Sequence, residues 1–283
     1  MSSSLQADHI IHAATCELEQ TINRLFPEPL EHNRPSPQSQ NISQDHAKDL
    51  LQCTSPIVAP KSGYLQSIEI DQLLKLATRY DLLLHLDHLP GDFVIQGELL
   101  VLVSSHGSLE NNRGKKIRKT CTIGMRRTPA QDVRFAIDQV VEVAVRAVSS
   151  AINDPFTAIT CLDWLGMALC HLDKRNLPSL ALYDQEKHVR VITRPLTFED
   201  ITDVAFNKIR YASQTNVAVI IHLLETIGLV AAQTKTRELR SALLRHANLV
   251  AVDCLQGQSD QSGQQAITLH YQAVMEQLSS DST

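Results

Sequence analysis

The chain has 283 residues, of which 43% are apolar and 20% are charged, and its formal net charge is −5. This composition is ordinary for a soluble globular protein with one or two cores, and the acidic balance argues against bulk nucleic-acid binding. The longest strongly apolar, uncharged run lies between Arg210 and Glu225. It is shorter than the roughly 18 residues of a spanning helix, so the sequence predicts neither a membrane span nor a signal peptide.

Six cysteines are spread along the chain without a C-x-x-C pair or a dense framework. This usage is typical of reduced thiols in a cytoplasmic protein. The sequence predicts no metal site and no cofactor.

The first predicted element, within residues 1–26, is a helix over about 5–26, because apolar residues recur there at three- and four-residue spacing. Residues 27–53 are rich in Pro, Gln and Ser, and they predict a mobile linker followed by a short helix at about 45–51.

Residues 54–123 predict a small β module. The expected strands are residues 63–70, 82–88, 93–95 and 98–103. A short helix at 71–78 is expected between them, capped by Asp71. The glycines at 91 and 97 give a pattern that resembles the barrel-sandwich hybrid of biotinyl and lipoyl carrier modules, since glycine lets the chain turn between short strands. No lysine stands at the tip to carry a cofactor, so we expect a structural role.

His85, Asp87 and His88 suggest a metal site, but on a strand His88 points away from the other two. Two ligands are too few for a metal, so a structural role is favoured.

Residues 104–125 contain a run of basic side chains that no acidic residue interrupts after Glu110. We expect a loop here, with two interpretations: a solvated segment, or contact with anionic lipid headgroups, which attract such clusters. Nucleic acid is a weaker alternative because no aromatic residues interleave. The candidates for lipid contact are Arg113, Lys115, Lys116, Arg118 and Lys119.

Residues 124–256 predict a helical domain whose first helix runs over about 129–148. Thr128 is a suitable N-cap, Pro129 fits the first helical position, and Gln131 completes a capping box. The helix is apolar around most of its circumference, which is typical of a buried central helix. Its polar residues form a ladder with a step of four residues: Arg134, Asp138, Glu142 and Arg146.

Two interpretations of this ladder stay open. Its members can pair as Arg134–Asp138 and Glu142–Arg146 along a solvated edge. Alternatively, the ladder is a buried polar network that faces a pocket or a partner, because buried charges must be paired. The ladder and its neighbours give these ligand or interface candidates: Arg127, Asp132, Arg134, Asp138, Gln139, Glu142, Arg146, Asn153, Asp154 and Thr157.

A second helix is expected to begin at Asp154 and Pro155, a capping residue followed by proline. Its first N–H groups, up to Thr157, could bind an anion, but the carboxylate of Asp154 opposes this.

The remaining elements are a hairpin and further helices. Residues 181–183 and 189–193 predict a β-hairpin, and Thr197 with Asp200 predicts a capping box for the next helix. Helices over about 217–230 and 237–254 follow. Residues 257–283 predict a polar linker and a last helix at about 267–278, which packs weakly or on a partner chain.

Two separated blocks carry a resemblance to a known family. The first is Gly63-Tyr64-Leu65-Gln66, followed by Ile70-Asp71 and Pro90-Gly91-Asp92-Phe93-Val94. The second is Arg127-Thr128, Gln131-Asp132, Phe135, Gln139 and Ile152-Asn153-Asp154-Pro155. In this order they are similar to a bacterial family known as domain of unknown function 2254 and described as predicted membrane proteins. The resemblance implies transmembrane helices ahead of this region and no agreed activity.

Together these observations predict an α+β protein, a small β barrel-sandwich-like module followed by a mainly α-helical domain with one β-hairpin. We expect a homo-oligomeric domain on the cytoplasmic side of the inner membrane that senses, gates or assembles. It would meet the membrane through preceding transmembrane helices or through anionic lipid, without nucleic acid. The alternative is a hydrolase-like enzyme that uses the ladder and the Asn153–Asp154 turn. No nucleophile with a nearby base or glycine-rich phosphate loop supports that alternative.

Overall fold

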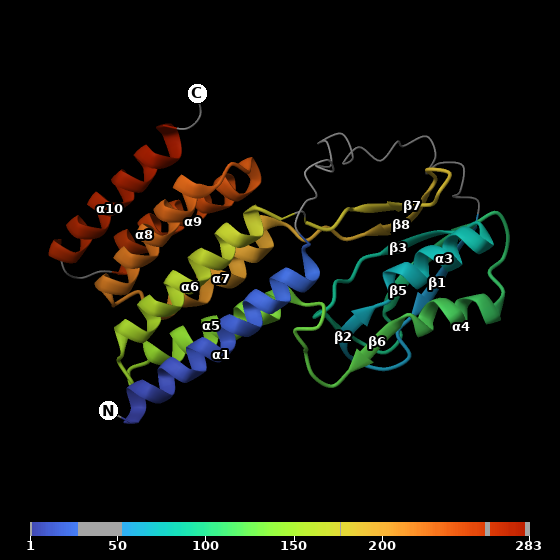
Figure 1. Ribbon diagram of the computed structural model, residues 1–283, viewed down its shortest axis with the longest axis horizontal. Coiled ribbons are helices and arrows are strands. Elements are labelled where there is room, and N and C mark those ends of the chain that lie inside the picture. The colour runs from blue at the N-terminus through green and yellow to red at the C-terminus, as the bar shows by residue number, and fades with distance from the viewer. Residues whose placement is uncertain (1, 28–52, 176, 258–260, 281–283) are drawn as a thin grey trace. The chain divides into compact units, whose positions relative to one another are not determined.

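The computed structural model describes residues 2–27, 53–175, 177–257 and 261–280. The chain forms two compact units (Figure 1). The β unit comprises Leu30–Phe135 and Leu177–Leu196, and the helical unit comprises Met1–Pro29, Ala136–Asn176 and Thr197–Thr283. The expected linker and its short helix lie outside the described residues, apart from the linker's two end residues.

The larger sheet of the β unit has the strand order β1-β5-β3-β8-β7. Its strands are β1 (Cys53–Val58), β5 (Leu99–Ser105), β3 (Leu83–Leu86), β8 (Val189–Thr193) and β7 (Ala181–Tyr183). Neighbours are antiparallel except β3 and β8, which run parallel with Leu84 opposite Val191. The predicted hairpin is formed by β7 and β8, and it extends this sheet.

A smaller sheet has the order β4-β2-β6. Its strands are β4 (Phe93–Val94), β2 (Gly63–Ile68) and β6 (Cys121–Gly124). The β unit also contains the helices α3 (Ile70–Tyr80) and α4 (Asn111–Lys119). Leu65 of β2, Leu84 of β3 and Ile117 of α4 belong to one buried core, so both sheets and both helices share an apolar interior. The mixed α+β class is confirmed.

Two expectations for the β unit are wrong. The basic segment is the helix α4 and not a loop, because its Lys and Arg residues are good helix formers and Ile117 anchors one side in the core. The other concerns α3, where Glu69 and not Asp71 occupies the N-cap position, without a side-chain capping bond.

The helical unit contains the remaining helices of the described residues. They are α1 (Ser2–Leu25), α5 (Val133–Ala147), α6 (Pro155–Asp173), α7 (Phe198–Ala212), α8 (Val217–Gln233), α9 (Arg237–Gly257) and α10 (Gln261–Ser280). The first three residues of α5 belong to the β unit. Helix α8 packs against α6, α9 and α10, and its Leu223, Leu224 and Ile227 are fully buried. The predicted caps are confirmed at Asp154 and at the Thr197–Asp200 box.

Helix α5 begins at Val133 and not at the expected Pro129. Asp132 caps the helix instead, and its Oδ1 accepts the N–H of Phe135 at 3.0 Å. The Gln131 side chain accepts the N–H of Ile68 on β2 at 2.9 Å. Gln131 therefore bonds to a strand that is distant in the sequence, and not to the neighbouring backbone as the capping box predicted.

Helix α10 begins inside the segment expected to be a polar linker, and the expectation of weak packing is wrong. It packs on α8 and α9 of its own chain. Ile267, Val274 and Leu278 form its buried stripe.

Candidate functional site

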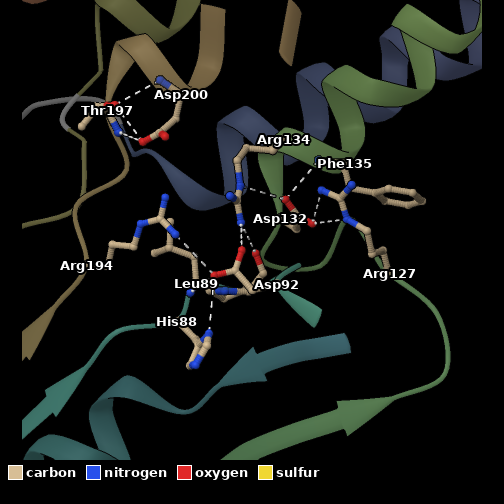
Figure 2. A network of polar contacts seen from close by, with 11 residues as sticks. His88, Leu89, Asp92, Arg127, Asp132, Arg134, Phe135, Arg194, Thr197 and Asp200 are labelled. Carbon is tan, nitrogen blue, oxygen red and sulfur yellow. Dashed lines mark hydrogen bonds and ion pairs between the residues drawn. The ribbon is translucent and has the colours of Figure 1, made fainter. Parts of the chain in front are cut away.

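A cluster of arginines and carboxylates joins the turn at residues 89–92 to the start of α5 within the β unit (Figure 2). We call these six side chains the polar clamp: His88, Asp92, Arg127, Asp132, Arg134 and Arg194. In the turn, Asp92 Oδ2 accepts the N–H of Leu89 at 2.9 Å. Gly91 has a φ of 96°, a conformation that side-chain-bearing residues rarely adopt.

Asp132 is the buried member of the clamp, with its side chain 1% exposed. Besides capping α5, it accepts a hydrogen bond from Arg127 Nε at 2.9 Å, and Arg134 Nε lies 3.8 Å away. Burial raises the pKa of the Asp132 carboxyl above its ordinary value, and the two guanidinium groups oppose that shift. The two arginines therefore offset the cost of placing this charge inside the protein.

Arg134 connects the two carboxylates of the clamp. Its Nη2 donates to Asp92 Oδ1 at 2.8 Å and to the carbonyl of Pro90 at 3.1 Å. Its side chain is 16% exposed, and charge-assisted bonds in such a setting are about twice as strong as neutral ones. Arg134 thus fixes the first turn of α5 on the 89–92 turn.

His88 and Arg194 complete the clamp around Asp92. Arg194 Nη1 lies 3.7 Å and His88 Nδ1 lies 3.9 Å from Asp92 Oδ2. The other ring nitrogen of His88 lies 3.0 Å from the carbonyl of Leu99 and 3.6 Å from Glu98. This histidine therefore joins the turn to the start of β5.

The clamp is built to hold structure rather than to move protons. Both carboxylates, Asp92 and Asp132, accept hydrogen bonds from guanidinium groups, so the oxygens that would take a proton from a substrate are already engaged within the clamp. The arginines of the clamp donate hydrogen bonds to these carboxylates, and Arg134 also donates to the backbone carbonyl of Pro90. These contacts hold the residues that begin α5 against the 89–92 turn.

The predicted ladder does not act as one unit. Arg134 turns to Asp92, while Asp138 and Glu142 share Lys208 of α7 at 2.8 Å and 3.2 Å. These contacts reach beyond α5, whereas the pairs expected from the sequence, Arg134–Asp138 and Glu142–Arg146, lie within the helix. Hydrogen bonding to Asp138 raises the pKa of Lys208.

The other two candidate residues on α5, Arg146 and Gln139, differ in their exposure to solvent. Arg146 is exposed, and its carbonyl accepts the hydroxyl of Ser149 at 2.7 Å. Gln139 Oε1 is buried without a hydrogen-bond partner among the described residues.

The turn before α6 is a helix cap. Asp154 accepts the Thr157 N–H at 3.3 Å and the Thr157 hydroxyl at 2.7 Å, and Asn153 has a φ of 50°. The carboxylate of Asp154 thus occupies the place that an anion would take.

Helix α4 gathers the five predicted lipid-contact residues on one short element. Of these, Lys115, Lys116 and Lys119 are exposed. Lys116 Nζ donates to the Tyr80 hydroxyl at 3.1 Å, and this bond lowers the pKa of the phenol. The guanidinium of Arg113 lies 4.8 Å from the centre of the same ring. Tyr80 therefore holds two of the cations against α3.

Sequence reasoning missed two features. Asp92 and Arg194 were not candidates, because their partners are far away in the chain. A polar cluster between α7 and α9 was also missed; it consists of Glu199, Asp203, Arg210, Arg245, His246 and Asp253. The recurrence of polar residues on α7 at three- and four-residue spacing was the one available signal for it.

Comparisons with known proteins now decide the family. A family profile described as "Predicted membrane protein (DUF2254)" matches residues 1–228. The chain belongs to this family. Uncharacterized proteins of Mycobacterium bovis and Mycobacterium tuberculosis are each 30% identical over 239 residues, which cover 81% of this chain and 43% of the relative.

The DUF2254 chain thus spans less than half the length of these curated relatives. The resemblance predicted from the two sequence blocks is confirmed. No solved structure matches the chain.

Among the described residues, α6 is long and apolar enough to cross a membrane, by length and composition alone. The sequence expectation of no such segment overlooked it, because Asp163 interrupts its apolar run. Of its most apolar window, 44% is buried. Since core helices pass the same test, this is weak support for a span.

Proposed function

We propose that this chain is a non-enzymatic module of a membrane protein that rests on anionic lipid through α4 and serves in sensing, gating or assembly. The observation that carries the proposal is the exposed basic surface of α4, which we call the lysine face: Lys115, Lys116 and Lys119. The DUF2254 description as predicted membrane proteins supports the proposal, because it is consistent with association of the chain with a membrane.

The charge of α4 is opposite to that of the whole protein. Its nine residues carry five basic side chains and no acidic one, whereas the chain has a net charge of −5. Near an anionic leaflet each Lys or Arg contributes about 1 kcal/mol. The three exposed lysines can therefore give reversible attachment that weakens with salt.

The alternative, an enzyme that uses the ladder and the Asn153–Asp154 turn, is less well supported. Arg134 and the pair Asp138–Glu142 serve different contacts, and Asp154 is used as a helix cap. A catalytic site would need these groups to converge on one substrate.

Vesicle co-sedimentation tests the lipid contact. The chain is mixed with vesicles of phosphatidylcholine, with or without phosphatidylserine, at low and high salt. We expect binding only to the anionic vesicles, a loss at high salt, and a marked loss in Lys115→Ala/Lys119→Ala. The matched control is Lys61→Ala, an exposed lysine of the β unit outside α4. Equal loss in the control and the α4 variant would sink the proposal.

The side of the membrane is a separate part of the proposal, and we place this module in the cytoplasm. Cys53 is exposed, whereas burial raises the pKa of the Cys121 thiol and slows its reaction. An impermeant maleimide added to intact cells that make the whole protein should leave Cys53 unlabelled until lysis. Labelling before lysis would contradict a cytoplasmic location.

We also propose that the module is a homo-oligomer, as expected of an assembly element. Light scattering after size-exclusion chromatography of the chain tests this, with a single monomer mass as the contrary result.

A further inference from the structure

A pocket of about 220 Å³ lies at the N-terminal end of α4, within the β unit. Tyr80 and Asp81 form one side, at the end of α3. The segment from Ser105 to Leu109 and Arg113 form the other. Since water occupies about 30 Å³ per molecule, the pocket has room for a small polar molecule of several heavy atoms.

One side of this pocket suits an anion. Arg113 lines it and donates to Glu110 at 2.7 Å with one nitrogen; a guanidinium has five N–H donors, so others remain for a ligand. His106 also lines the pocket, and its side chain is 58% exposed. Lys116 stands beside Tyr80 and adds positive charge nearby. A phosphate would meet a cationic, hydrogen-bonding wall here.

The opposite side suits hydroxyl groups. Asp81 Oδ1 accepts a hydrogen bond from Arg190 at 2.6 Å, which offsets part of the charge of the carboxylate; Arg190 also donates to Asp184 at 2.7 Å. Asp81 Oδ2 lies 3.8 Å from His106 Nε2, and the side chain is 61% exposed. This oxygen can therefore accept a hydrogen bond from a ligand hydroxyl, and the hydroxyl of Ser108, which also lines the pocket, can take part.

We propose that the pocket binds the headgroup of an anionic polyol phospholipid, with the phosphate on Arg113 and His106 and the hydroxyls on Asp81. This inference rests on the proposed lipid contact and names the class of lipid. Lys116 of the lysine face donates to the hydroxyl of Tyr80, which lines the pocket, so the pocket adjoins the lysine face. The lysines supply general attraction to negative charge, and the pocket supplies selectivity among headgroups.

Two lipids of equal charge separate these roles. Phosphatidylglycerol and phosphatidylserine each carry one net negative charge, but only the former ends in a neutral polyol. In co-sedimentation at matched lipid fraction, we expect the chain to partition about fivefold more strongly onto phosphatidylglycerol vesicles. One additional hydrogen bond between the headgroup and the pocket would give a partition ratio of about this size.

Three variants identify the source of the preference. Asp81→Asn should remove the preference, measured as the ratio of phosphatidylglycerol to phosphatidylserine binding, and His106→Ala should weaken binding to both lipids, because both carry the phosphate. Both side chains are largely exposed, and asparagine tolerates the left-handed conformation of Asp81, whose φ is 51°. Lys119→Ala lies outside the pocket, so it should weaken binding to both lipids and keep their ratio.

Each outcome separates the two proposals. Equal binding of both lipids, lost in Lys115→Ala/Lys119→Ala, would overturn the pocket and leave the lipid contact standing. Binding to neither lipid would overturn both. Calorimetry with soluble glycerol 1-phosphate tests the source of the headgroup. If this probe binds but vesicles do not, the pocket binds a soluble polyol phosphate, and the proposal of a phospholipid headgroup is contradicted.

Discussion

Gly91 and Asp132 lie so close together that no side chain fits between them. A Cβ atom on Gly91 would stand 1.8 Å from Asp132 Oδ2. The carboxylate cannot simply move aside, because it also caps α5 and accepts a hydrogen bond from Arg127. The 89–92 turn and the polar clamp therefore require each other, although 41 positions of sequence separate the two residues (132 minus 91).

The first prediction is that Gly91→Ala is far more harmful than Gly97→Ala. Both glycines have a positive φ, 96° and 89°, but a Cβ on Gly97 meets nothing within 4 Å. Gly97→Ala should cost only the backbone strain, about 1–2 kcal/mol. Gly91→Ala adds a clash and should cost about 3 kcal/mol or more. Urea denaturation followed by circular dichroism measures both free energies of unfolding.

A double-mutant cycle tests the cause. In an Asp132→Ala background the clash is absent, so Gly91→Ala should cost no more than Gly97→Ala does. If the Gly91 penalty were the same with and without the Asp132 carboxylate, the close approach would not be its source.

The second prediction distinguishes the clamp from the outer part of the ladder. Arg134→Met removes a guanidinium that is 16% exposed and leaves Asp92 and Asp132 short of a partner, so we expect a loss of about 2–3 kcal/mol. Glu142 is 48% exposed, and Glu142→Ala should cost less than about 0.5 kcal/mol. Similar losses in the two variants would contradict the separation of the ladder into two environments.

The sequence correctly predicted those helix N-termini that are capped by a side chain within a few residues of the first turn. Asp154 with Thr157, and Thr197 with Asp200, satisfy backbone groups three residues away, so the sequence there contains the whole interaction. The same logic misplaced the start of α5. Gln131 found a better partner in the backbone of Ile68 on β2, and local spacing contains no information about that strand.

Only some residues of the candidate site could be predicted from the sequence, because the sequence does not show which distant residues they contact. Arg127, Asp132 and Arg134 stood out because they crowd the start of one helix. Asp92, the partner of Arg134, lies 42 residues earlier in the chain. The ladder was expected to pair within α5, but Lys208 of α7 reaches Asp138 from 70 residues away. Parallel pairing of β3 with β8 is likewise a property of the folded sheet.

The third prediction concerns α10, which the sequence did not assign to the core. Ile267 is 1% exposed and Leu269, two positions further on, is 65% exposed. Ile267→Ala should therefore cost about 2–4 kcal/mol through lost burial and the cavity it leaves, and Leu269→Ala should cost less than about 0.5 kcal/mol. Comparable effects in the two variants would mean that α10 does not pack on α8 and α9 in solution.

The fourth prediction is a pH dependence that comes from His246. This imidazole is fully buried; its Nε2 lies 3.2 Å from Asp203 Oδ1, and its ring meets Phe206 edge-on. Its Nδ1 has no hydrogen-bond partner among the described residues. Burial, with Arg245 and Arg210 adding repulsion, lowers the pKa of His246 from 6.5 to about 4. The imidazole is therefore neutral in the folded protein at pH 7.

The sign follows from proton counting. Between pH 6.5 and pH 4 the unfolded chain binds a proton at His246 that the folded chain refuses, so stability falls as the pH is lowered. This group should contribute up to about 3 kcal/mol of loss across that window. His246→Gln removes the titration, so its free energy of unfolding should vary less with pH, although it starts lower at pH 7.

Comparing the pH dependence of stability in the wild-type chain and in His246→Gln also removes the contributions of other titrating groups to that dependence. Asp132 works in the opposite direction, since its raised pKa means that the folded state holds its proton more tightly than the unfolded state does. Subtracting the curve of the variant from that of the wild-type chain cancels Asp132 and leaves His246. Parallel curves over pH 4–6.5 would show that His246 does not titrate as its burial between α7 and α9 requires.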